Sequence, residues 1–355
     1  MQPGSRAVSP AGADCATIVC VTRLFEARLI NGGFGDPVLY LDFLHERRAL
    51  LFDIGEIQAL RPREILRVSD VFVSHTHIDH FCGFDRLLRV MLNRDRTVRL
   101  HGPEGLIANV AGKLAGYTWN LVDDYRLRLQ VQEIGARRAR RVTFSCRDRF
   151  RARSGARESP FAGVVLEEEG FTVEARHLDH AVPCLGFRLH ERVHFNVNGD
   201  RLRRLGWETG PWLGRVKSLL RGGRPGRTPV RVPVSEGGRV RLRSLTLEQI
   251  AAAVVIATPG ETLAYVTDIR RSPENDRRVL ELAAGADHLF CEAAFLDRDA
   301  DHARRKHHLT ARQAGELARQ AGARRLTIFH FSPKYESEEP LLRAEAVQAH
   351  EGPGA

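Results

Sequence analysis

The sequence of 355 residues lacks the features that mark membrane and disulfide-bonded proteins. No run approaches the roughly 18 apolar residues that a membrane-spanning helix needs. The first twenty residues also lack the basic start and apolar stretch of a secretory signal. The six cysteines are scattered and form no C-x-x-C pair (Cys15, Cys20, Cys82, Cys146, Cys184, Cys291). These absences predict free thiols and a cytoplasmic protein without a membrane partner.

Lysine is scarce, so arginine carries nearly all of the positive charge. The chain has 54 Lys and Arg residues against 44 Asp and Glu, a net charge of +10, while its hydrophobic fraction of 43% is ordinary for a globular protein. An excess of arginine can reflect codon composition alone, or it can indicate an anionic partner such as nucleic acid. The distribution of the charge has to decide between the two.

The charge is concentrated in residues 192–243. This segment has thirteen Lys or Arg residues against three Asp or Glu, a local charge of +10 that equals the whole-chain value. Trp207 and Trp212 lie in it among scattered Gly and Pro. The composition predicts an inserted, partly irregular basic arm. The two tryptophans could stack on RNA bases or pack the arm against itself.

The remaining chain alternates strand-like and helix-like segments. Residues 1–17 are rich in Gly, Ala, Pro and Ser and are predicted to be disordered, with one domain over 18–355. Apolar periodicity predicts helices over 85–94, 104–117, 310–323 and 338–349. Thr310 and Gln313 form the capping-box pattern at the start of the third. Core patterning returns after the arm with AAAVVIATPG, residues 251–260.

Four metal-ligating side chains follow the apolar strand at Val71–Val73. They are His75, His77, Asp79 and His80. Imidazole and carboxylate groups are ligands of zinc, and two residues that alternate on an extended backbone can face one point while the next two turn toward a second. Two metals about 3.5–4 Å apart suit phosphoester hydrolysis. A chance cluster of surface histidines is the alternative.

Such a site needs further ligands, which we expect at other strand ends. Asp268 ends LAYVTD, His330 ends RLTIFH, and His180 competes with His177 in RHLDHAVPC. Taken singly, an aspartate at a strand end is more often a turn former and a histidine there a core residue. The residues alone leave these choices open.

These motifs together resemble the metallo-β-lactamase fold and, within it, the ribonuclease Z family of tRNA 3′-end processing endonucleases. The H-x-H-x-D-H run is similar to the second motif of the superfamily, and LLFDIGE, with Asp53, to the first. DHAVPCLGFRL resembles the third and selects His180 over His177. YVTDIR with Asp268 and LTIFHFSPKY with His330 resemble the fourth and the last.

Three segments resemble ribonuclease Z more narrowly. CEAAF resembles its His-Glu-Ala-Thr loop and gives Glu292, and HHLTARQAGELA resembles another of its loops and gives His308 rather than His307. ETGPWLGRVKSLLRGG resembles its exosite arm. The resemblance covers about Ala49 to Tyr335.

The resemblance implies an α/β (α+β) fold, the metallo-β-lactamase αββα four-layer sandwich, interrupted by an exosite-like arm over 192–243. It also implies two Zn²⁺ ions per chain, with Mn²⁺ as the other metal to consider, and a homodimer that acts on precursor tRNA. The implied ligands are three histidines for one ion, three residues for the other, and a bridging aspartate: His75, His77 and His180; Asp79, His80 and His330; Asp268.

The same resemblance implies the catalytic roles. A metal-bridged hydroxide, oriented by Asp79, would attack phosphorus, and His308, oriented by Glu292, would protonate the leaving oxygen. Asp53 would orient a ligand histidine without binding metal. The sequence departs from the family at Ile78, where glycine is usual, and at Cys291, where histidine is usual.

Three functions therefore remain open. The first is a ribonuclease Z-type endonuclease that removes 3′ trailers from precursor tRNA. The second is a small-molecule hydrolase of the same fold, such as a cyclic-nucleotide phosphodiesterase or an arylsulfatase, which would have no use for a basic arm. The third is a non-catalytic RNA-binding protein, against which the intact set of ligands argues.

Overall fold

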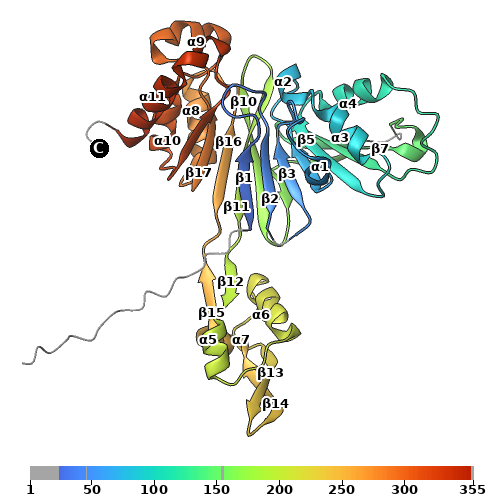
Figure 1. Cartoon of the computed structure of the whole chain (residues 1–355), viewed down its shortest axis with the longest axis vertical. Coiled ribbons are helices and arrows are strands. Elements are labelled where there is room, and N and C mark those ends of the chain that lie inside the picture. Colours follow the sequence, from blue (N-terminus) through green and yellow to red (C-terminus); the bar gives the residue numbers. More distant parts are fainter. Residues whose placement is uncertain (1–23, 45, 153–155, 353–355) are drawn as a thin grey trace, which may run out of the picture.

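Two packed β-sheets dominate the computed structural model, which describes residues 24–44, 46–152 and 156–352 (Figure 1). The predicted disordered tail, 1–17, lies outside the described residues. The larger sheet has eight strands in chain order: β1 Phe25–Leu29, β2 Leu39–Phe43, β3 Ala49–Phe52, β4 Val68–Phe72, β5 Thr97–Pro103, β6 Arg128–Ile134, β7 Arg138–Ser145 and β8 Arg157–Pro160.

The smaller sheet has six strands in the order β18-β17-β16-β11-β10-β9. Parallel pairing joins β16 to β17 and β17 to β18, and the other pairs are antiparallel. The strands are β9 Val164–Glu167, β10 Phe171–Asp179, β11 Pro183–Glu191, β16 Thr262–Val266, β17 His288–Glu292 and β18 Leu326–Phe329.

Helices cover the outer face of each sheet, which gives the four layers that the resemblance implies (Figure 1). None of the helices in the described part of the chain has the length and apolar character needed to span a membrane. Over the larger sheet lie α1 Pro62–Ile65, α2 Ile78–Phe81, α3 Phe84–Met91 and α4 Leu106–Ala115. Over the smaller sheet lie α8 Pro273–Ala283, α9 Ala300–Lys306, α10 Ala311–Gln320 and α11 Glu339–Glu351.

The predicted helices form because each has one apolar stripe facing a sheet. In α10 the stripe is Ala311, Ala314, Leu317 and Ala318, all buried. Thr310 caps this helix through the predicted capping box with Gln313. A separate core of aromatic and aliphatic side chains lies between the two sheets and includes Phe52, Phe72 and Phe187.

Three residues within two positions of a strand end adopt left-handed backbone conformations, which residues other than glycine rarely adopt. They are Asp53 (φ 56°), Asp268 (φ 47°) and His330 (φ 61°), following β3, β16 and β18. Such conformations persist where surrounding structure enforces them, often at functional sites. Gly55 is required nearby, because a Cβ there would lie 2.2 Å from the carbonyl oxygen of Asp79.

The inserted arm projects from the sandwich as a separate body (Figure 1). A two-stranded stalk, β12 His194–Val197 and β15 Val255–Thr258, carries it. The predicted range of 192–243 is therefore too short, and the AAAVVIATPG segment belongs largely to the arm, not to the main core. The arm also contains α5 Gly199–Arg204, α6 Pro211–Arg221, β13 Pro229–Glu236, β14 Arg239–Thr246 and α7 Leu247–Val254.

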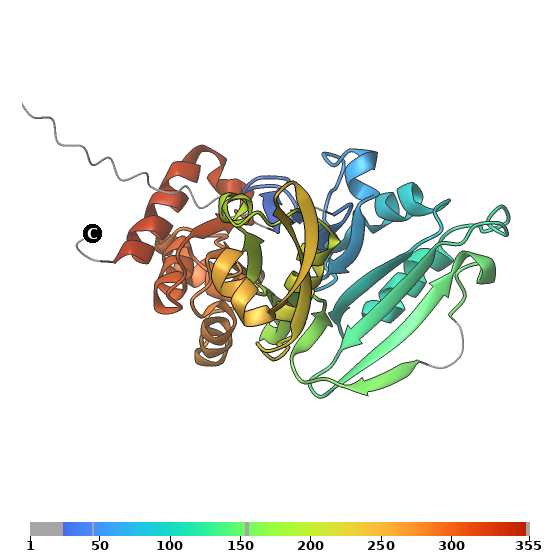
Figure 2. The ribbon, with the colours of Figure 1, turned by 90° about the horizontal axis from the view of Figure 1, so that it is seen from below.

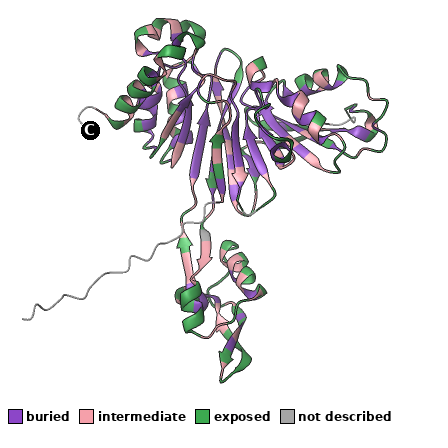
Figure 3. Cartoon of the chain, viewed as in Figure 1, coloured by how far each residue is buried: buried purple, intermediate pink, exposed green. Residues whose placement is uncertain are grey.

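Buried residues are abundant in the sandwich and fewer in the arm (Figure 3). The arm nevertheless has its own apolar cluster, which includes Trp212, Val216, Val232 and Ile250. It is thus a small folded unit and is more regular than the Gly and Pro content predicted.

Candidate metal centre

Side chains of ligand type converge where parallel strands end at one edge of the sandwich. A first group contains His75, His77, His180 and Asp268, with all four ligand atoms within 4.8 Å of one another. Nε2 of His75 lies 2.8 Å from Nδ1 of His77. Asp268 Oδ2 lies 3.6 Å from His75 Nε2 and 3.4 Å from His180 Nε2. These atoms surround one point.

A second group contains Asp79, His80 and His330. His80 Nε2 lies 3.5 Å from Asp79 Oδ2 and 3.4 Å from Asp268 Oδ2. His330 Nε2 lies 3.2 Å from Asp79 Oδ2, and its Nδ1 lies 3.0 Å from Asp268 Oδ1. Asp268 therefore borders both groups, as a bridging ligand would.

The polar atoms of the two groups fit a bound cation. Among the described residues, His80 Nε2 and His330 Nδ1 are buried and have no hydrogen-bond partner, although each lies near an oxygen of Asp268. A buried polar atom without a partner is costly, so its placement calls for an explanation. A metal ion between the nitrogen and the carboxylate would satisfy both.

The pKa values of two of the histidines, His75 and His80, also fit a bound cation. Burial and the neighbouring His80 lower the pKa of His75 to about 2, so this ring is neutral and can bind metal. Burial lowers the pKa of His80, but the carboxylates of Asp268 and Asp53 outweigh it and raise that pKa to about 10. The surroundings of His80 therefore favour a positive charge, which a metal ion can supply in place of the proton.

Three residues outside the two groups form a hydrogen-bond network around His80. Asp53 is fully buried, and His80 Nδ1 lies 2.9 Å from its Oδ2, which leaves Nε2 of His80 facing the second group. Ser74 donates its backbone N–H to Asp53 at 2.6 Å, and the Tyr265 hydroxyl donates to it at 2.9 Å. Such partners fix the ring orientation of ligand histidines. The sequence predicted this position for Asp53 but missed Ser74 and Tyr265.

The backbone orients His180. Its Nδ1 lies 2.9 Å from the carbonyl oxygen of His307, which ends α9 in a left-handed conformation (φ 60°). His177 lies outside both groups, because its Nε2 is within 3.0 Å of the Ile134 carbonyl oxygen. The structure therefore brings His180, and not His177, to the site. A carbonyl contact of this kind leaves no signal in a sequence.

A carboxylate–histidine pair borders the metal groups. His308 Nδ1 lies 2.9 Å from Oε2 of Glu292, whose Oε1 accepts the backbone N–H of Ile269 at 2.6 Å. Burial lowers the pKa of His308, but the charge of Glu292 outweighs it and raises that pKa above its ordinary value. The ring nitrogen not held by Glu292 is therefore available as a proton donor.

Comparison with known proteins identifies the family. Residues 225–331 match the model of the beta-lactamase superfamily domain. The ribonuclease Z of Deinococcus radiodurans is 31% identical over 303 residues, which cover 84% of this chain and 87% of the relative. That of Salinibacter ruber is 33% identical over 302 residues, which cover 83% of this chain and 80% of the relative. This chain belongs to the ribonuclease Z family.

The fold has a match among solved structures. The metallo-beta-lactamase fold protein YhfI from Bacillus subtilis superimposes with a TM-score of 0.52 at 15% identity, covering 92% of each chain. This supports the predicted fold. Together with the ribonuclease Z family it implies binding of divalent metal, which the two groups of side chains fit.

Two departures from the ribonuclease Z pattern lie at the site. Cys291 is fully buried in β17, and burial raises the pKa of its thiol far above the ordinary value, so it is an inert core residue. Ile78 begins α2 and is 82% exposed, directly before Asp79.

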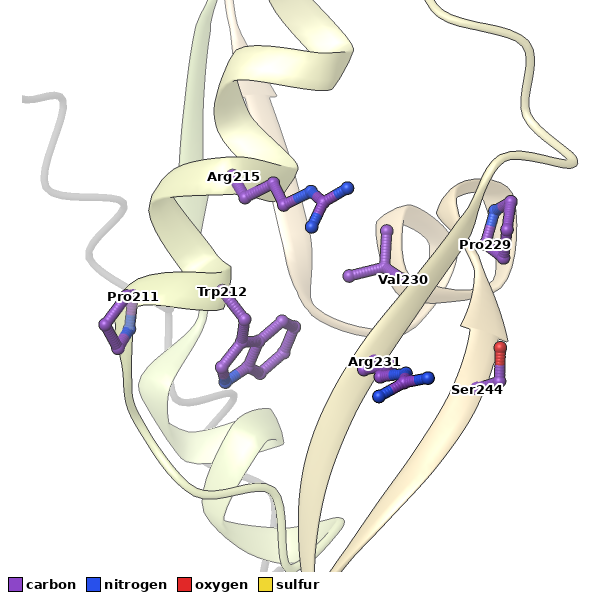
Figure 4. A pocket seen from close by; sticks show the side chains of 7 residues that line it. All are labelled: Pro211, Trp212, Arg215, Pro229, Val230, Arg231 and Ser244. Atoms are coloured by element: carbon purple, nitrogen blue, oxygen red, sulfur yellow. The ribbon is translucent and has the colours of Figure 1, made fainter.

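The arm tryptophans pack the arm. Trp212 is 9% exposed and donates its Nε1–H to the Glu208 carbonyl oxygen, and its ring centroid lies 6.0 Å from that of Trp207. A hollow of about 590 Å³ lies between α6 and the β13–β14 hairpin. Figure 4 shows Trp212 and Arg215 on the α6 side of the hollow and Arg231 on the β13 side. Two arginines, Arg215 and Arg231, lie among the mostly apolar residues that line the hollow.

Proposed function

We propose that this chain is a zinc-dependent endoribonuclease that removes the 3′ trailer from precursor tRNA. The convergence of seven ligand-type side chains on two adjacent points, beside the Glu292–His308 pair, carries the proposal. Its relatives named ribonuclease Z share most of its length. A non-catalytic RNA-binding protein would not need this set of metal ligands.

We assign the metal ligands as two sets that share a carboxylate. The donors are imidazole nitrogens and carboxylate oxygens, a set that zinc favours and that manganese also accepts. Two bound ions would lower the pKa of water and neutralise charge on the phosphate. One ion would be held by His75, His77 and His180 and the other by Asp79, His80 and His330, with Asp268 next to both.

The chain's own residues then control the protons. The Asp79 side chain is 37% exposed, more than the Asp268 side chain at 3%. This exposure supports our assignment of Asp79 as the group that would orient the attacking water. His308, held at Nδ1 by Glu292, donates a proton from Nε2 to the 3′-oxygen that leaves the phosphorus. A protonated leaving group departs more readily, so this step favours cleavage.

We assign RNA binding to the arm. Its local charge of +10 over 192–243 attracts phosphates, and binding would release counterions. His180 precedes β11 and the arm follows it, so the nine residues of that strand, about 30 Å, separate the arm from its own metal centre. This separation suits a homodimer in which the arm of one subunit holds RNA at the site of the other.

One experiment separates this function from a small-molecule hydrolase. Purified protein is incubated with a 3′-extended tRNA precursor and, in parallel, with bis-p-nitrophenyl phosphate. We expect cleavage of the precursor at the trailer junction and turnover of the ester. Turnover of the ester alone would overturn the proposal and favour a phosphodiesterase that acts on small molecules.

A further inference from the structure

The outer strands of the larger sheet carry a second concentration of charge. Between Arg137 and Arg157 the chain has nine arginines against one aspartate, a local charge of +8. Arg153 lies outside the described residues. The other arginines lie on β7, β8 and the segments next to them, and the outer strands of this sheet reach away from the rest of the molecule (Figure 2). The segment lies outside the arm and contains none of the assigned ligands.

Strand register divides these arginines between two faces. Val142 and Phe144 of β7 point into the core under the helices, so Arg138 and Arg140 lie on that helix-covered side. Arg141 lies on the opposite side, which faces the second sheet. Arg157 of β8 is its register partner. The pair continues a row across the sheet from Phe72 through His101 and Gln132.

The two faces differ in whether their arginines have carboxylate partners. On the helix-covered side, Arg138 lies 2.9 Å from Glu158 and Arg140 lies 3.5 Å from Glu133. On the other side, Arg141 contacts the amide oxygen of Gln132 at 3.1 Å. In the described part of the chain, no carboxylate lies within ion-pair distance of Arg137, Arg141 or Arg157, all of which are exposed.

Like charges directly opposite on paired strands are destabilising. The Arg141–Arg157 pair is therefore unfavourable in the isolated chain, whereas an anion bound between the two side chains would reverse the effect. A phosphate group of RNA has the required charge and can accept hydrogen bonds from two guanidinium groups.

The position of this face relative to the metal centre indicates which part of the substrate it can contact. Because β4, β5 and β6 are parallel, the turn after Ile134 lies at the same edge of the sheet as His75, which follows β4. β7 is three strand positions from β4, or about 14 Å. Arg137 stands at that edge, directly before β7.

On the opposite flank of the site more of the positive charge is paired with carboxylates. Near α9 and α11 several arginines have carboxylate partners: Arg298 lies 2.6 Å from Glu338, and Arg312 lies 3.0 Å from Asp297. An RNA strand that leaves the metal centre therefore meets uncompensated positive charge on the β7–β8 side.

From this arrangement, and resting on the proposed function, we infer that the exposed face around Arg137, Arg141 and Arg157 binds the single-stranded 3′ trailer of the substrate. The trailer leaves the metal centre along the sheet edge, and its phosphates lie between the guanidinium groups. The arm holds the body of the RNA, and this face holds the part that is removed.

The test uses a pair of variants on the same strands. Arg141→Gln with Arg157→Gln removes the uncompensated pair, and Arg138→Gln with Arg140→Gln removes two charges from the opposite face as the matched control. Binding of a short unstructured RNA oligonucleotide is measured against salt concentration. Cleavage is measured with precursors that carry a long or a very short trailer.

We expect the Arg141/Arg157 variant to lower the salt slope of oligonucleotide binding by about 1.4, the value for two single-strand phosphate contacts, and the control to change it little. KM should rise for the long-trailer precursor and stay unchanged for the short one. Equal effects of the two variants, or a loss that does not depend on trailer length, would overturn the inference. Oligonucleotide binding reports on this face even if the parent protein cuts no precursor, so the two proposals can fail separately.

Discussion

The metal centre and the arm differ in how the chain builds them. The metal centre gathers side chains from four separate segments, the run 75–80 and the single residues His180, Asp268 and His330, whose relative positions the whole sandwich fixes. The arm is one continuous insertion, 194–258, with its own apolar cluster and a narrow stalk. A change at the centre should therefore affect all chemistry, whereas a change in the arm should affect RNA and leave the chemistry intact.

The largest effect is expected from Asp268→Ala, because this carboxylate borders both ligand groups. Metal content per chain and turnover of both precursor tRNA and bis-p-nitrophenyl phosphate should fall to background, while RNA binding through the arm remains. Metal analysis and a binding assay check this. Asp301→Ala, at an exposed ion pair with Arg304, is the control. Full metal occupancy in the Asp268 variant would contradict the assignment.

His308→Ala should separate proton transfer from metal binding. The variant should retain its metal, while cleavage of precursor tRNA should slow by about 10²–10⁴-fold, the usual contribution of general acid catalysis. The loss should be much smaller on bis-p-nitrophenyl phosphate, because p-nitrophenolate leaves without a proton. Steady-state kinetics on both substrates provide the measurement. An equal loss on the two would argue against the acid role of His308.

Removal of the arm should give the reverse of the pattern expected for Asp268→Ala: RNA binding should be weakened and the chemistry retained. The N–H of Asn198 donates to the carbonyl oxygen of Val254 at 2.8 Å, so a short Gly-Ser linker can replace residues 199–253. Binding of precursor tRNA should weaken and its salt dependence should flatten, because several phosphate contacts are lost. Hydrolysis of bis-p-nitrophenyl phosphate should persist. If the shortened protein binds and cuts precursor like the parent, the arm does not hold RNA.

The smallest effect on chemistry is expected from Trp212→Ala. Truncating this buried ring should destabilise the arm by about 3 kcal/mol through the cavity it leaves. Amide exchange in α5 to α7 should accelerate, while exchange in the sandwich and hydrolysis of the small ester stay unchanged. Destabilisation that spreads into β11 and β16 would mean that the arm and the sandwich fold as one unit.

Much of the metal centre could be predicted from sequence. Four of the ligand-type residues lie in one short run: His75, His77, Asp79 and His80. Because this run follows the end of a strand and then turns, its sequence limits the directions in which the side chains can point. The periodic helices were also predictable, and α10 begins at its predicted cap, Thr310. The flanking sequence did not identify three further residues as ligands, namely His180, Asp268 and His330. Only the family resemblance selected them.

Other features depended on the tertiary structure. The arm reaches Thr258 because β15 pairs with β12, a contact between segments about sixty residues apart that local periodicity does not encode. Ser74, Tyr265 and the carbonyl of His307 orient the histidines from three separate elements.

The sequence by itself determined the kinds of ligand, the strands and helices that carry them, and the total charge, because these follow from local composition and periodicity. The tertiary structure decided which side chains share a site and which charges are compensated. Arg138 and Arg141 are three residues apart in one strand, yet one has a carboxylate partner and the other faces a second arginine. That difference arises from strand register and from the face each residue occupies, and both are fixed only when the sheets pack.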